Sequence, residues 1–127
     1  MFTFAFDPSA RILTITGEGL WSLSTLTAFS AEALARGGAL RLRHGQFAVL
    51  NDVRKMPIQL PEVARGLEIL TAKSAAITTA PIAVVVGSVL SKIQVERVVN
   101  APNTKAFLTI EEAKAWLALN WTVQAAA

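Results

Sequence analysis

The residues of this sequence that could bind a ligand stand where two apolar runs end. Asp52 and Arg54 follow the first run, and Gly87 and Ser88 close the second. Ligands gather at the carboxyl ends of parallel strands in an open α/β sheet, so these four positions would meet at one edge. Arg54 would hold an anion, and the backbone N–H groups after Gly87 would complete the cradle at a helix N-terminus. The alternative is structural: Asp52 and Arg54 pair with each other, and Ser88 only caps its helix.

The only histidine, His44, is the one imidazole available for proton transfer. A catalytic triad would place it beside Asp52 and a hydroxyl such as that of Ser88, with an oxyanion site nearby. Its arginine- and glycine-rich surroundings instead predict a solvated basic loop over 36–44, which could touch acidic lipid headgroups or a partner's carboxylates. The chain has no cysteine, and its nine acidic residues are scattered. We therefore expect no enzyme activity, no metal and no cofactor.

The composition is unusually apolar for a single domain of 127 residues. Hydrophobic residues make up 53% and charged residues 17%, against about 45–50% and about 25% in typical domains. Some of this excess must face outward, which favours a homodimer. The formal net charge of +3 arises from twelve basic and nine acidic residues that are interspersed. This balance does not favour specific nucleic-acid binding.

Neither a signal peptide nor a membrane span is expected. The N-terminus has no basic segment followed by a long apolar core. The longest uncharged stretch lies between Lys73 and Lys92, where Pro81 and Gly87 interrupt it with several hydroxyl residues. The cysteine-free composition is compatible with a reducing cytoplasm, and we expect a cytoplasmic protein.

Apolar periodicity and capping residues predict an α/β domain that spans the whole chain. The expected elements are a hairpin over about 2–6 and 11–18, a helix from a Ser22 cap to Gly37-Gly38, a strand ending at Asn51-Asp52, a helix opening at Pro61, a strand over 81–87, a helix from Ser88 to about Asn100, a strand over 105–108 and a helix capped by Thr109. The order is β-β-α-β-α-β-α-β-α. It favours a mainly parallel mixed sheet with an N-terminal antiparallel hairpin and four helices.

Three local patterns add to this scheme. Trp21 is expected to pack beside the first helix rather than stack on a ligand. Val89, Ile93 and the Val98/Val99 region should form the apolar side of the third helix. The tail over 120–127 has no charged side chain, so it should dock on the domain or on a second subunit.

The chain resembles the STAS-like superfamily, which includes bacterial anti-anti-sigma factors and the cytoplasmic domains of sulfate transporters. The resemblance covers nearly the whole chain. It rests on the element order, on the strand end Leu50-Asn51-Asp52-Val53-Arg54, and on the closing pattern from Ala106 to Ala113 with Trp116-Leu117. It implies a single STAS-like domain over 1–127 that binds a protein or a small ligand without catalysis, often as a dimer.

Regulatory members of this superfamily carry a phosphorylatable Ser or Thr just after an aspartate at the end of the third strand. Here Asp52 is followed by Val53, Arg54, Lys55 and Met56, so the hydroxyl is missing. We therefore expect a binding or regulatory module that lacks the phosphorylation switch. The alternative is a carrier or sensor of a small apolar or amphipathic molecule at a membrane surface, which an apolar cavity of a few hundred Å³ would support.

Overall fold

The computed structural model describes residues 1–74, 76–98 and 102–122, and it confirms the predicted fold class and element order. The elements are β1 (Phe2–Asp7), β2 (Ile12–Glu18), α1 (Leu23–His44), β3 (Ala48–Lys55), α2 (Pro61–Ser74), β4 (Ile82–Val85), α3 (Val89–Val98), β5 (Thr104–Phe107) and α4 (Ile110–Asn120). Within the described ranges, no helix is both long enough and apolar enough to cross a membrane.

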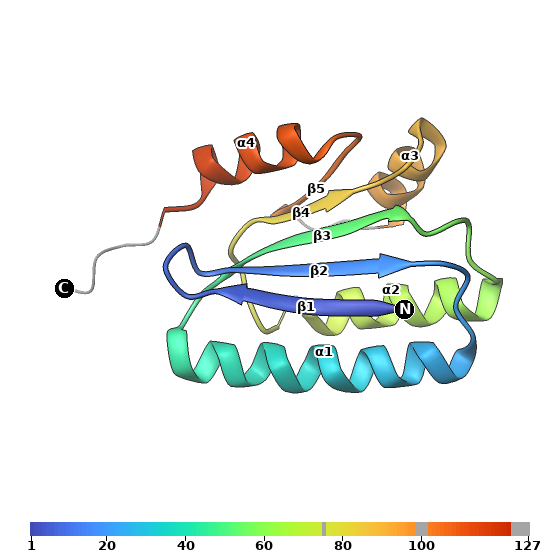
Figure 1. Cartoon of the computed structure of the whole chain (residues 1–127), viewed down its shortest axis with the longest axis horizontal. Coiled ribbons are helices and arrows are strands. Elements are labelled where there is room, and N and C mark those ends of the chain that lie inside the picture. Colours follow the sequence, from blue (N-terminus) through green and yellow to red (C-terminus); the bar gives the residue numbers. More distant parts are fainter. Residues whose placement is uncertain (75, 99–101, 123–127) are drawn as a thin grey trace.

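The five strands form one mixed sheet in the order β1-β2-β3-β4-β5 (Figure 1). β1 and β2 are antiparallel, with Phe2 opposite Gly17 and Asp7 opposite Ile12. The pairs β2–β3, β3–β4 and β4–β5 are all parallel. The carboxyl ends of these four strands therefore lie at one edge, which we call the carboxyl edge. We call the opposite edge the amino edge.

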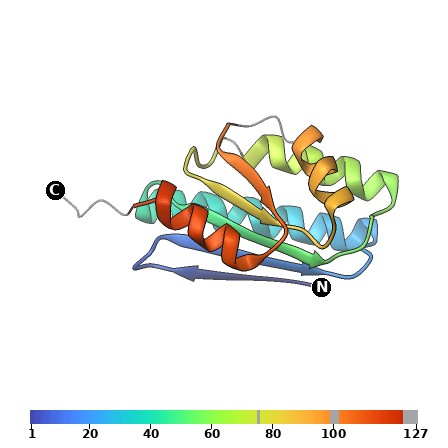
Figure 2. The same cartoon turned by 90° about the horizontal axis from the view of Figure 1, so that it is seen from above.

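Helices cover both faces of the sheet, which explains why the inner strands are apolar on both sides. α1 and α2 lie on one face and α4 lies on the other (Figures 1 and 2). On the α1/α2 face, Leu13 and Val49 are buried beside Phe47. On the α4 face, the core consists of Ala48, Leu50, Ala83, Val85, Phe107, Ala113 and Leu117. Side chains alternate along β2, with Leu13 buried on the α1/α2 face and Thr14 on the opposite face.

The predicted helix starts are confirmed by their capping hydrogen bonds. The Thr25 N–H donates to Ser22 Oγ at 3.2 Å, which satisfies one of the free donors at the start of α1. In α4 the Glu112 N–H donates to Thr109 Oγ1 at 3.2 Å, as a capping box requires. Trp21 is only 3% exposed and packs in the core with Phe29, so its structural role is confirmed.

The prediction that the first helix ends at Gly37-Gly38 is wrong, and so is the basic loop over 36–44. α1 continues through both glycines to His44 and ends at Gly45, whose φ is 79°. The Gly45 N–H donates to the Arg41 carbonyl at 3.0 Å. Each helical glycine costs about 1 kcal/mol relative to alanine. This cost is offset because Leu40, beyond the glycines, packs against the core on the α1/α2 face.

One further boundary and one helix face differ from the sequence prediction. β3 runs on to Lys55 instead of ending at Asp52, because β2 continues beside it and Glu18 pairs with Lys55. The predicted apolar side of α3 is also wrong. Val89 and Ile93 are 61% and 45% exposed, whereas Ser91 and Val95, four residues apart, face the cavity described below. Val99 and the predicted end of that helix near Asn100 lie outside the described residues.

Candidate functional site

Asp52 and Arg54 lie together on the α4 face at the carboxyl edge. The Arg54 guanidinium donates from Nη2 to Asp52 Oδ2 at 2.8 Å and from Nε to Oδ1 at 2.9 Å. The Arg54 N–H also donates to Oδ1, at 3.2 Å. Hydrogen bonding from the Arg54 side chain is the main cause that holds the pKa of Asp52 below its usual value, against a smaller opposing effect of burial. Arg54 is therefore engaged within the chain.

Gly87 and Ser88 follow β4 at the same edge. A Cβ on Gly87 would lie 2.6 Å from the Arg54 carbonyl oxygen, so glycine is needed for the close approach of the two backbones. Ser88 Oγ accepts from the Ser91 N–H at 3.1 Å and donates to Ser91 Oγ at 2.9 Å. The structure thus brings Asp52, Arg54 and Gly87 together. The pairing of Asp52 with Arg54 and the cap by Ser88 are the contacts expected if these residues only stabilise the fold. The anion cradle stays a prediction.

The residues weighed for a catalytic triad are not assembled. His44 ends α1 at the amino edge, where its ring lies 4.9 Å from that of Phe6. Asp52 and Ser88 lie at the carboxyl edge, at the other end of the strands. Among the described residues, no group of three His, Asp or Glu side chains gathers as metal ligands would.

A cavity of about 580 Å³ lies beneath the helices of the α1/α2 face, flanked by α2 and α3. We call it the α2/α3 groove. Its floor includes Val84 and Val86, and its walls include Leu67 of α2 and Val95 of α3. Its lining also includes three aromatic side chains: Trp21 and Phe29, whose rings lie 4.9 Å apart, and Phe47, which belongs to a separate core cluster. Residues of both helices line the groove, among them Thr71 of α2 and Ser91 of α3.

Asn51 is the exception on this apolar floor. Its place on β3 is between Ile15 on β2 and Val84 on β4, in the middle of the α1/α2 face. No hydrogen bond joins its side-chain amide to another described group, and every fully buried side-chain N or O atom in the described ranges has a partner. The Asn51 amide therefore opens into the α2/α3 groove, which it lines.

Sequence reasoning missed this groove, although one signal for Asn51 was present. Val49, Asn51 and Val53 alternate along β3, so an amide takes a position that the pattern assigns to the apolar face. The cavity itself is lined by residues from several strands and helices distant in the sequence, which no local pattern encodes.

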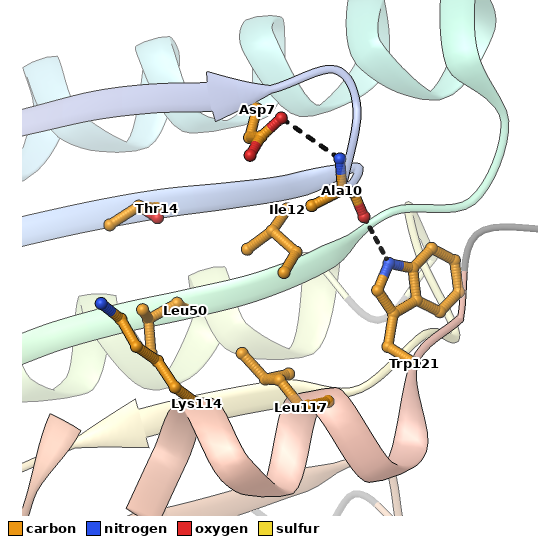
Figure 3. Close-up of a pocket in the computed structure, with 9 residues that line it drawn as sticks. Asp7, Ala10, Ile12, Thr14, Leu50, Lys114, Leu117 and Trp121 are labelled. Atoms are coloured by element: carbon orange, nitrogen blue, oxygen red, sulfur yellow. Dashed lines mark hydrogen bonds between the residues drawn. The ribbon is translucent and has the colours of Figure 1, made fainter. Parts of the chain in front are cut away.

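A second, shallower hollow of about 470 Å³ lies on the opposite face, between α4 and the β1–β2 hairpin (Figure 3). Leu50 and Leu117 form its apolar base, and the Lys114 side chain extends along it. Trp121 closes one end by donating from Nε1 to the Ala10 carbonyl at 3.0 Å. This contact docks the start of the predicted tail on the domain, while residues 123–127 lie outside the described ranges.

No family model matches the chain, and no curated protein is significantly similar to it.

Proposed function

We propose that this chain is a non-catalytic, STAS-like binding module that holds a small apolar or amphipathic molecule in the α2/α3 groove. The observation that carries the proposal is the cavity of about 580 Å³ with an apolar floor and walls. Sites for small molecules typically have volumes of about 300–1,000 Å³ and apolar linings with a few polar groups. The cysteine-free sequence fits a reducing cytoplasm, which we propose as its location.

The missing switch hydroxyl supports a ligand-controlled role rather than a phosphorylation-controlled one. Asp52 occupies the position of the aspartate in regulatory members of the superfamily that the chain resembles. Here its carboxylate is paired with Arg54 at 2.8 Å. Ligand binding in the groove would let this module respond to its surroundings without phosphorylation.

Fluorescence titration with the neutral probe N-phenyl-1-naphthylamine tests the proposal directly. The probe should bind the full chain at a stoichiometry of one, with the increase in emission that an apolar site produces. Native mass spectrometry of freshly purified protein should show additional non-covalent mass if a cellular ligand is retained. Saturable binding is the expected result, and its absence would refute the proposal.

A matched pair of α2 variants locates the binding. Thr71 lines the groove at its exposed rim, whereas Ile69 on the same helix is 52% exposed and does not line it. Thr71→Trp places an indole across the opening and should weaken probe binding at least tenfold. Ile69→Trp should leave it unchanged. Equal binding by both variants would place the probe elsewhere.

A second candidate function, binding to another protein or to a second copy of the chain, is favoured by the outer side of α3. Val89, Leu90 and Ile93 are 61%, 56% and 45% exposed and lie within one and a half turns of helix. Clustered apolar exposure of this kind is typical of interaction sites. Leu90→Glu should convert a dimer into a monomer in native mass spectra. Leu42→Glu, at a 91% exposed leucine on α1, is the control.

A further inference from the structure

We propose that the α2/α3 groove selects uncharged amphiphiles and that Asn51 is the residue that recognises their polar group. This inference rests on the proposed function and adds the chemical class of the ligand. The juxtaposition that carries it is the Asn51 amide, open on an apolar floor, in a groove whose lining has no cationic side chain among the described residues.

Asn51 is a polar residue on the apolar floor of the groove. A polar side chain on the buried face of a sheet is unfavourable for folding unless it is hydrogen-bonded. Its neighbours across the sheet, Ile15 and Val84, offer no side-chain partner. An amide offers both a donor and an acceptor. A hydroxyl, amide or carbonyl of a ligand in the groove would therefore complete the hydrogen bonding that the folded chain leaves open.

The described lining of the groove carries little charge. Glu68, at the exposed rim on α2, is the only ionisable residue among the described residues that line the groove. The nearest basic residues along β3, Arg54 and Lys55, are not part of the lining. An anion in this apolar space would lose its hydration without gaining a cation, and Glu68 would repel it. The groove therefore disfavours carboxylates and phosphates.

The lining also restricts the shape of the ligand. Asn51 lies on the floor, and the walls carry apolar side chains, among them Leu67 of α2 and Val95 of α3. A suitable molecule has a ring or short chain that packs among these apolar side chains and one neutral polar group within reach of Asn51. Aromatic alcohols and neutral amides of moderate size have this composition.

Three ligands of nearly equal size test the selectivity: 2-phenylethanol, ethylbenzene and phenylacetate. Each is titrated at pH 8 against the protein loaded with N-phenyl-1-naphthylamine, and displacement is followed by fluorescence. The wild-type chain should bind 2-phenylethanol at least tenfold more tightly than phenylacetate. Asn51→Leu should weaken 2-phenylethanol about 2- to 10-fold, the effect of one neutral hydrogen bond. It should leave ethylbenzene unchanged or slightly tighter.

A gain-of-function variant tests the charge argument without altering the sheet. Glu68→Lys replaces the rim carboxylate by a cation on an exposed helix position. It should tighten phenylacetate about 2- to 5-fold, as expected for an exposed ion pair, and leave 2-phenylethanol unchanged. Ile69→Lys, next to it and outside the lining, is the control and should change neither affinity.

The outcomes separate this inference from the function on which it rests. Equal displacement by 2-phenylethanol and phenylacetate, or equal weakening of 2-phenylethanol and ethylbenzene in Asn51→Leu, would overturn the inference and leave the binding function intact. Failure of the probe itself to bind would overturn both.

Discussion

Replacing Gly38 by alanine should stabilise the protein, because α1 passes through this position without interruption. No atom lies within 4 Å of the place that a Cβ at Gly38 would take, so the added methyl meets no obstacle. Alanine is favoured over glycine inside a helix by about 1 kcal/mol. We therefore expect the free energy of unfolding to rise by about 0.5–1 kcal/mol, measured by urea denaturation of the full chain.

Gly45→Ala is the matched comparison, because Gly45 is the residue that ends α1. Its φ of 79° and ψ of −146° are accessible to glycine but strained for other residues. The substitution should lower the free energy of unfolding by about 1–3 kcal/mol. Gly37→Ala should fall between the two, because its Cβ would approach Ile77 Cδ1 to 3.3 Å and that side chain must shift.

The signs of these changes decide between two positions for the helix end. If α1 ended at Gly37-Gly38, one of these glycines would adopt a left-handed conformation, and alanine there would destabilise the chain by about 1 kcal/mol or more. Gly45 would then lie in an ordinary loop, where alanine has little effect. A destabilised Gly38→Ala variant beside a neutral Gly45→Ala variant would therefore refute the continuous helix.

Three further substitutions test the carboxyl edge and the docked end of α4. Gly87→Ala should lower the free energy of unfolding by about 1–3 kcal/mol in urea, because its Cβ would meet the Arg54 carbonyl at 2.6 Å. The lowered pKa of Asp52 means that its carboxylate stabilises the fold above the unfolded pKa near 3.8, and this contribution is lost as the pH falls through the folded pKa. Asp52→Asn should therefore reduce the loss of folding stability at acidic pH. An unchanged loss at acidic pH would contradict the pairing of Asp52 with Arg54. Trp121→Phe removes the hydrogen bond to the Ala10 carbonyl and should cost about 0.5–1.5 kcal/mol by the same urea assay, with no loss expected if that contact does not form.

Much of the fold could be predicted because its signals are local. Caps such as Ser22 and Thr109 act within one turn of helix, and the alternation along β2 depends only on which face is buried. The apolar run that became β4 is short and β-branched, and it lies inside the sheet with helices on both faces. The parallel connections followed from the alternation of strands and helices along the chain.

The candidate site could be predicted only in part. Asp52, Arg54 and Gly87 do meet at the carboxyl edge, because parallel strands end together. Whether Arg54 is free for an anion depends on its rotamer, and the side chain turns back onto Asp52 at 2.8 Å. The rotamer is a property of the packed neighbourhood, so the sequence left both interpretations open.

The sequence by itself determined the order of elements, the hairpin, the helix starts and the faces of the strands, since each depends on neighbours a few residues away. The tertiary structure decided where α1 ends, because the apolar contacts of Leu40 outweigh the low helix propensity of two glycines. It also decided that α3 leaves Val89 exposed and that residues of α2 and α3 line one cavity with Asn51. Such a cavity depends on how side chains distant in the sequence pack together, and that information exists only once the chain is folded.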